Sequence, residues 1–450
     1  MKPFHSLHRS GLAFALLAAT ALAGCSHGGP IHSKPHPATP TVGNRIPILS
    51  RIEDAARPDP SIAMQAVVLP SQAENAEWAQ PGGGASKSYG NLALAAKPEK
   101  VWTAKIAGSN ERQRLAAAPV VGSGLLYALD TDGVVSAFDA KSGALRWKQS
   151  FDVMGEASQA VFGGGASYAD GKLYVTTGLG LVAALDATNG KVLWKVTPAG
   201  PLRGAPTVAF GSLFVMTQNN EIHALNIADG TELWQEAASL GQAGVFGVAA
   251  PAAGQGTVVA GYSTGELIAY RYENGRTLWS DALSRTSLST SVGVLTDIDA
   301  DPIIDRGRVY ALGQGGRMAA YELVTGQRIW ELNLAGISTP AVAGDWIFTL
   351  TDDARLLCIE RNTGKVRWVA ELDRYRNPGK KDGPIFWTGP VLAGDRLWVG
   401  SSTGQIETVS VMDGVVSHYA QMRAPVTLAP IVAGKTLYVL DDSGLITAFR

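Results

Sequence analysis

Residues 137–147 read AFDAKSGALRW, and 184–194 repeat the same spacing as ALDATNGKVLW. In both, an aspartate follows the alanine by two positions, a glycine comes four positions later, and a tryptophan four positions after that. Further copies keep the glycine and the tryptophan in 224–234, 269–279, 320–330 and 358–368, and a degenerate copy, 408–418, ends in histidine. Because tryptophan makes up only 11 of 450 residues, six at one fixed offset indicate an internal repeat.

The length and content of each repeat favour a β-propeller. The copies start about 40–50 residues apart, which is typical of propeller blades, solenoids and arrays. Within a period, short β-rich runs such as 173–176 (LYVT) and 181–184 (LVAA) are joined by tight-turn residues that favour hairpins. A third short run precedes each pair, and the motif is itself a hairpin whose glycine takes a left-handed conformation. Four strands per period make one propeller blade.

The two ends of the repeat complement each other. The last copy stops at Ala448-Phe449-Arg450 and lacks a tryptophan strand, whereas 100–103 (KVWT) is a tryptophan strand with no preceding motif. Strand 100–106 therefore completes the blade that begins near Val426, and such closure removes exposed sheet edges. The sequence predicts an all-β ring of eight four-stranded antiparallel blades, in one domain over 74–450.

The N-terminal region predicts export and lipidation. Residues 1–24 have a positive start and an apolar run, 11–23, that is too short to span a bilayer and is typical of a signal peptide. The run ends in LAGC, which resembles the bacterial lipobox, so we expect Cys25 to become the lipidated first residue. Ordinary signal-peptide cleavage nearby is the alternative. Residues 25–73 are predicted to be a flexible spacer followed by an extended arm.

Charge and motif content exclude several function classes. Lysine and arginine number 38 against 39 aspartates and glutamates, a balance that argues against nucleic-acid binding by phosphate neutralisation. The sequence has no Gly-x-Ser-x-Gly, His-Glu-x-x-His or phosphate-loop motif. We therefore expect no catalytic residues, no cofactor and no metal, and Cys358 to be a buried small hydrophobe.

The eleven-residue motif resembles the tryptophan-docking motif of quinoprotein (PQQ-type) propellers. The resemblance implies that each indole stacks over the turn of a neighbouring blade. The expected docking residues are Trp102, Trp147, Trp194, Trp234, Trp279, Trp330 and Trp368. A PQQ-dependent periplasmic dehydrogenase is the alternative function, but such enzymes often use a vicinal disulfide, and the two cysteines here are far apart in the sequence.

The lipobox, the spacer and the eight-bladed propeller together resemble the BamB family of outer-membrane assembly lipoproteins. Two segments carry the resemblance further: 201–206 (PLRGAP) resembles the family's Leu-Arg-Gly segment, and 295–302 (LTDIDADP) its Asp-x-Asp-x-x-Pro loop. The resemblance implies that these loops, on adjacent blades, contact the periplasmic POTRA domains of BamA. The partner-binding candidates are then Leu202, Arg203, Asp297 and Asp299. Gly200 stands where the family often has a further leucine.

Two other interpretations of these residues stay open. An exposed Arg203 would be a hot-spot anchor, but it could instead form an internal salt bridge with Asp297 or Asp299. The aspartate run also suggests calcium, although an EF-hand loop needs glycine and glutamate where Pro302 and Arg308 stand.

The family resemblance implies a non-catalytic scaffold lipoprotein on the periplasmic face of the outer membrane, held there only by its lipid. It would bind BamA, join the BAM complex through it, and aid the insertion of unfolded β-barrel precursors. Addition of precursor strands at blade edges is one hypothesis for the mechanism.

Overall fold

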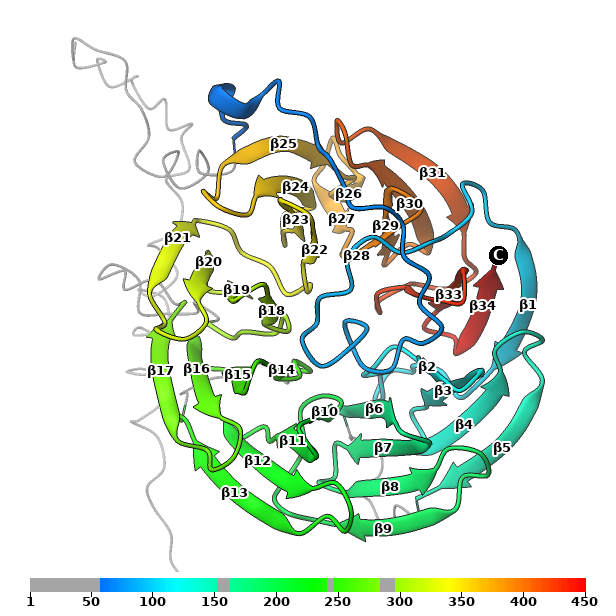
Figure 1. The fold of residues 1–450 in the computed structure, drawn as a ribbon. Coiled ribbons are helices and arrows are strands. Elements are labelled where there is room, and N and C mark those ends of the chain that lie inside the picture. The colour runs from blue at the N-terminus through cyan, green and yellow to red at the C-terminus, as the bar shows by residue number, and fades with distance from the viewer. Residues whose placement is uncertain (1–56, 152–161, 241–246, 284–295) are drawn as a thin grey trace, which may run out of the picture. The chain divides into compact units, whose positions relative to one another are not determined.

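The computed structural model describes residues 57–151, 162–240, 247–283 and 296–450, and these residues form a ring of eight β-sheets. Figure 1 shows the sheets side by side around a common centre, and the sheets built from four consecutive strands have their first strand innermost. The predicted all-β propeller with eight four-stranded antiparallel blades is confirmed. A single 3-10 turn, η2 (Pro60–Ile62), is the only helix in the described part of the chain.

Seven blades each use four consecutive strands. Blade 1 consists of β2 (Val120–Gly122), β3 (Leu125–Leu129), β4 (Val134–Asp139) and β5 (Leu145–Ser150), and blade 2 of β6 (Gly164–Ala169), β7 (Lys172–Thr177), β8 (Val182–Asp186) and β9 (Val192–Val196). Blade 3 consists of β10 (Thr207–Ala209), β11 (Ser212–Met216), β12 (Glu221–Asn226) and β13 (Glu232–Ala237). Blade 4 consists of β14 (Ala252–Gly254), β15 (Thr257–Gly261), β16 (Glu266–Arg271) and β17 (Thr277–Ala282). Blade 5 consists of β18 (Ile303–Asp305), β19 (Arg308–Gly313), β20 (Arg317–Glu322) and β21 (Arg328–Leu332). Blade 6 consists of β22 (Ala341–Ala343), β23 (Trp346–Leu350), β24 (Arg355–Glu360) and β25 (Val366–Glu371). Blade 7 consists of β28 (Trp387–Ala393), β29 (Arg396–Ser401), β30 (Gln405–Ser410) and β31 (Val416–Gln421). A small hairpin, β26 (Tyr375–Asn377) and β27 (Asp382–Pro384), lies between blades 6 and 7.

The eighth blade joins the two ends of the propeller. Strands β32 (Ile431–Ala433), β33 (Thr436–Leu440) and β34 (Leu445–Phe449) come from the C-terminal end, and β1 (Lys100–Lys105) adds the outer strand. β1 and β34 are antiparallel, with Trp102 opposite Ala448. The predicted closure by an N-terminal tryptophan strand is therefore confirmed.

The repeated tryptophans lie where the motif requires them. Trp194 packs over Gly230 of the next blade, and its Nε1 donates a hydrogen bond to the Ile227 carbonyl at 3.2 Å. Gly230 has φ +76°, and a Cβ there would be 2.7 Å from the indole, so glycine is needed both for the backbone and for the contact. The same Nε1-to-carbonyl bond to the following blade is made by Trp102, Trp147, Trp234, Trp279, Trp330 and Trp368.

The ring has two faces that the strand directions define. The loop face carries the connections between blades and the turns between the second and third strands. Gly180, in the β7–β8 turn, packs against the carbonyl oxygens of Ala199 and Gly200 in the β9–β10 connection. The turn face carries the remaining two turns of each blade, which hydrogen-bond to each other, as from Ala140 N–H to the Gly124 carbonyl at 3.0 Å.

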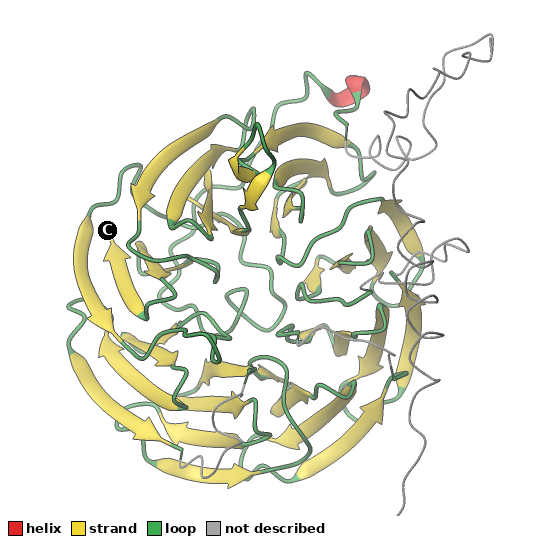
Figure 2. Ribbon diagram, turned by 180° about the vertical axis from the view of Figure 1, so that it is seen from behind, coloured by secondary structure: helices red, strands yellow, loops and turns green. Residues whose placement is uncertain are grey.

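Residues 57–99, here called the arm, close the centre of the ring from the turn face. Figures 1 and 2 show this segment crossing the middle of the propeller before it enters β1. Its contacts with the inner strands follow the order of the blades. Each contact is a hydrogen bond between one arm residue and one blade. The pairs are Asn75 with Gly434 (blade 8), Trp78 with Val121 (blade 1), Ala79 with Tyr168 (blade 2), Gln80 with Val208 (blade 3), Ala85 with Ala253 (blade 4), Ser86 with Ile304 (blade 5) and Leu92 with Leu392 (blade 7).

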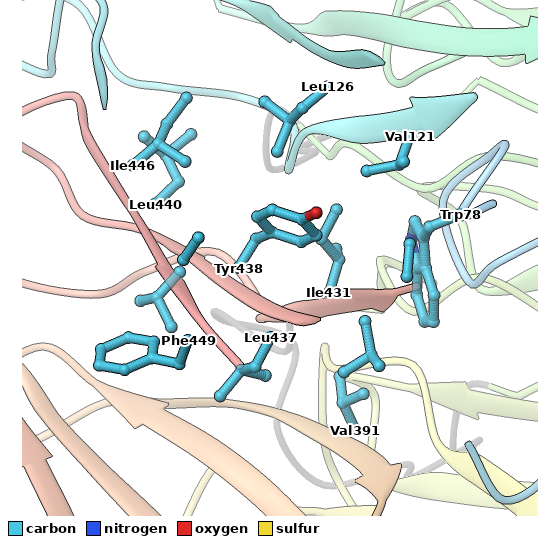
Figure 3. Packing of buried hydrophobic residues seen from close by; sticks show 14 of the residues in the cluster. Trp78, Val121, Leu126, Val391, Ile431, Leu437, Tyr438, Leu440, Ile446 and Phe449 are labelled. Carbon is cyan, nitrogen blue, oxygen red and sulfur yellow. The ribbon is translucent and has the colours of Figure 1, made fainter. Parts of the chain in front are cut away.

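The arm also contributes to the hydrophobic core. Trp78 belongs to a buried cluster that spans blades 1, 7 and 8, and Figure 3 shows its indole close to Val121 and Ile431. Further out, the Asp59 N–H donates to the Val366 carbonyl at 2.8 Å, on the outer strand of blade 6. Both ends of the arm are thus fixed to the propeller. The sequence predicts that residues 25–73 are a spacer followed by an extended arm, and in the structure the chain contacts the blades from Asp59 onward.

Candidate partner-binding site

Leu202 and Arg203 lie in the connection between β9 and β10, on the loop face. A β-bridge joins Leu202 to Thr217, and the Arg203 N–H donates to the Met216 carbonyl at 2.8 Å. The Arg203 carbonyl accepts a hydrogen bond from the Gly164 N–H, also at 2.8 Å. This connection is therefore fixed to the inner ends of blades 2 and 3.

Asp297 and Asp299 lie in the connection between β17 and β18, of which residues 296–302 are described. The Asp297 carbonyl accepts from the Gln314 N–H at 2.9 Å, and the Ile298 N–H donates to the Tyr262 carbonyl at 3.2 Å. The alternation of the chain here buries Ile298 completely and directs both aspartates to the same side.

An internal ion-pair cluster joins the two connections. One terminal guanidinium nitrogen of Arg203 lies 2.9 Å from Asp297 Oδ1 and 3.1 Å from Asp299 Oδ1, and it also donates to the Ile298 carbonyl. The side chains of Arg203 and Asp297 are 1% exposed and that of Asp299 is 10% exposed. The interpretation of Arg203 as an exposed anchor is thus wrong, and the geometry supports an internal salt bridge.

The two connections flank the adjacent blades 3 and 4, because β9–β10 leads into blade 3 and β17–β18 leaves blade 4. The β13–β14 connection passes between them, and Gly247 of that connection lies at the ion pair. A Cβ at Gly247 would collide with both Asp299 Oδ1 and the Arg203 guanidinium. Arg203 can therefore reach across one intervening loop only because that loop has glycine at the crossing point.

Two further ionisable side chains are buried in this part of the protein. Lys87 of the arm and Asp301 are also buried, with Lys87 Nζ 3.3 Å from Thr207 Oγ1 and Asp301 Oδ1 accepting from the Ala250 N–H. Burial raises the pKa of Asp299 to about 7, the Asp297 charge adds to the rise, and Arg203 opposes it. Burial likewise raises the pKa of Asp301 and lowers that of Lys87. Burial therefore favours the neutral form of Asp299, Asp301 and Lys87, whereas Arg203 remains the cation of the ion pair.

Two exposed apolar side chains lie on the loop face, one in the β7–β8 turn and one in the β13–β14 connection. Leu240 follows β13 and is 78% exposed, and Leu179 stands in the β7–β8 turn beside the Leu202 connection. Sequence reasoning missed both, although an apolar residue between the glycines of a turn, as in Gly178-Leu179-Gly180, was a usable signal. Because Leu202, Arg203 and Asp297 are buried and Asp299 is only 10% exposed, Leu179 and Leu240 are more accessible to a partner than the four residues found from the sequence.

Other predicted features have different outcomes. Cys25 lies outside the described residues. Cys358 is a buried free thiol whose pKa burial raises, in agreement with a core position. Within the described part of the chain no cluster of three or more His, Cys, Asp or Glu side chains is arranged to hold a metal ion. Nor do those residues include a helix with the length and apolar character needed to cross a membrane.

Comparison with known proteins decides the family. Residues 89–157 and 131–370 match the family model described as outer membrane protein assembly factor BamB. The chain belongs to the BamB family. A BamB relative from Moranella endobia (strain PCIT) is 25% identical over 358 residues, which cover 78% of this chain and 90% of the relative.

Solved structures agree with the propeller fold. The crystal structure of BamB from Moraxella catarrhalis aligns with a TM-score of 0.66 at 22% identity, over 78% of this chain and 99% of that chain. A quinohemoprotein alcohol dehydrogenase from Comamonas testosteroni aligns with a TM-score of 0.66 at 15% identity, over 89% and 84% of the two chains. At these identities the likeness concerns the fold alone, so the BamB family assignment rests on the sequence match.

Proposed function

We propose that this protein is a non-catalytic lipoprotein of the outer-membrane β-barrel assembly machinery that binds the POTRA domains of BamA through its loop face. The observation that carries the proposal is the Arg203 ion-pair cluster, which unites the two loop segments by which the chain resembles the BamB family. The cluster fixes the shape of one sector of the loop face, and a preformed surface loses less entropy on binding.

In this proposal the residues on that sector divide into two groups. Leu202, Arg203 and Asp297 are buried and Asp299 is 10% exposed, so these four act mainly as positioning residues that hold the loops in place. Leu179 and Leu240 are the exposed apolar contacts, of the kind that bury into a partner surface. Lipidation at Cys25 would hold the propeller at the periplasmic face of the outer membrane, where unfolded barrel precursors arrive.

A PQQ-dependent dehydrogenase is the second candidate, favoured only by the shared fold. It is tested by adding PQQ and Ca²⁺ to the purified chain and measuring dye reduction with alcohols; reduction above the buffer rate would support the enzyme.

Co-purification tests the assembly function. The full-length chain, tagged at its C-terminus, is extracted from outer membranes in mild detergent, and bound BamA is measured by immunoblot. BamA should be retained by the wild-type chain and by Val324→Asp, which changes a 72% exposed side chain on the turn face. It should be lost from a Leu179→Asp/Leu240→Asp variant. Absence of BamA from the wild-type preparation would remove the proposal.

A further inference from the structure

A cavity of about 980 Å³ lies at the centre of the ring. Its floor is the arm, which contributes Trp78, Pro81, Gly82 and Tyr89 to the lining. Its walls are the connections between blades, so the cavity opens toward the loop face and the arm closes its other end. The volume is at the upper end of the range for ligand sites, about 300–1,000 Å³.

The cavity has an apolar wall and rim. Ile337 and Phe386 are 48% and 65% exposed at the rim, and Phe386 precedes Trp387, which also lines the cavity. The deeper apolar lining includes Leu115, Val426 and Leu428. Such surfaces favour a ligand that brings its own apolar groups, because their burial releases water from both sides.

One side of the cavity is acidic. Asp299 and Asp301 line it at the blade 4–blade 5 connection, where Asp299 pairs with Arg203 and Asp301 interacts with Lys87. Asp301 is 8% exposed, and among the described residues only its Oδ1 accepts a hydrogen bond. Two lining arginines, Arg114 and Arg376, come from other connections, and Arg114 is close to the carboxylate of Asp442.

We propose that this cavity binds an extended polypeptide segment of a partner, with a lysine or arginine side chain against Asp299 and Asp301 and apolar neighbours against the rim around Ile337 and Phe386. A cation at this position would favour the ionised form of the two carboxyl groups and would form charge-assisted hydrogen bonds with them. A bare amine would leave the apolar rim in water, whereas a polypeptide segment satisfies both parts of the cavity.

This site is separate from the leucine contacts proposed for BamA, although both are on the loop face. The inference deepens the proposed function, because it gives a polypeptide-binding scaffold a second, central site with a stated preference. It is also independent in its test, because short peptides can be assayed without BamA.

Fluorescence polarisation of labelled peptides tests the proposal on the full-length chain in detergent. The probe is a nine-residue peptide of alternating valine and threonine with lysine at its centre. Matched peptides carry norleucine or glutamate there. The lysine peptide should bind about tenfold more tightly than the norleucine peptide, and the glutamate peptide should bind least. Equal binding of the lysine and norleucine peptides would overturn the charge preference.

Variants locate the site. Asp301→Asn should remove the advantage of lysine over norleucine, and Phe386→Ser should weaken both peptides. Because Phe386 is exposed, its replacement keeps the test valid even if Asp301→Asn lowers stability. Val324→Ser on the turn face is the matched control and should bind as wild type. Unchanged affinity in Phe386→Ser, or binding of spermidine without binding of any peptide, would contradict the assignment.

The same preparations separate this inference from the proposed function. If BamA co-purifies and no peptide binds, the central site fails and the assembly role stands. If peptides bind with the predicted preference and BamA does not co-purify, the assembly role fails and the central site stands.

Discussion

Removing the Arg203 cation should destabilise the propeller strongly, and the structure sets the scale. Arg203→Met keeps most of the side-chain volume but leaves Asp297 and Asp299 without their shared partner. Arg203 and Asp297 are both 1% exposed, so water cannot replace the lost pairing. Breaking a buried ion pair by removing one partner costs about 3–5 kcal/mol. We expect a loss of this size in the free energy of unfolding.

The assay is urea unfolding at pH 7.5, followed by tryptophan fluorescence, for Arg203→Met and for the triple variant Arg203→Met/Asp297→Asn/Asp299→Asn. The triple variant carries no uncompensated carboxylate, and neutral side chains can share hydrogen bonds, so it should recover much of the loss. Lowering the pH to 5.5 should partly rescue Arg203→Met, because burial raises the pKa of Asp299 and protonation then neutralises this carboxyl. A loss below about 1 kcal/mol, the scale of an exposed pair, would refute the buried-cluster account.

Three further predictions concern pH, docking and the arm. The pKa of Asp299 is about 7 in the folded protein against an ordinary 3.8, so the folded state holds this proton more tightly and loses stability as pH rises from about 4 to 7. At about 1.4 kcal/mol per pKa unit the effect is about 4 kcal/mol, and Asp299→Asn should flatten this part of the curve of unfolding free energy against pH. Gly230→Ala should lower the free energy of unfolding by about 2–5 kcal/mol, because the alanine adds left-handed strain and a clash with Trp194. The control Gly171→Ala, at φ +76° with open space around it, should add only the strain and lower it by about 1–2 kcal/mol. Equal losses in urea unfolding would argue against tight indole docking. Trp78→Ala should lower the free energy of unfolding by about 3–5 kcal/mol, since its indole is buried in the cluster of blades 1, 7 and 8, and a neutral result would mean that the arm is not part of the core.

The repeat allowed most of the ring to be predicted, because blade structure is local in sequence. The alanine-to-tryptophan spacing places Gly230 under Trp194, and the unmatched tryptophan strand at 100–103 predicts closure with 445–449. Each of these features depends on residues within one or two blades. The β26–β27 hairpin has no counterpart in the repeat, so the period could not indicate it.

The arm and the interior of the site were not predictable in the same way. The arm contacts successive blades at irregular intervals of one to six residues, so no periodic pattern marks them. The burial of Arg203 depends on Gly247 and on a carboxylate pair about a hundred positions away, which only the three-dimensional arrangement brings together. Family resemblance pointed to the two loop segments that form the ion-pair cluster, but it could not indicate that their side chains are largely buried.

The most direct test of the proposed role is the affinity of the full-length chain for the purified periplasmic domains of BamA, measured by biolayer interferometry. The comparison is between wild type, the loop-face variant Leu179→Asp/Leu240→Asp and the turn-face control Val324→Asp, each checked for folding by its urea midpoint. We predict saturable binding for wild type and the control, with the same Kd, and at least about a tenfold weaker Kd for the loop-face variant. Absence of binding by wild type, or equal Kd values for all three proteins, would contradict the account.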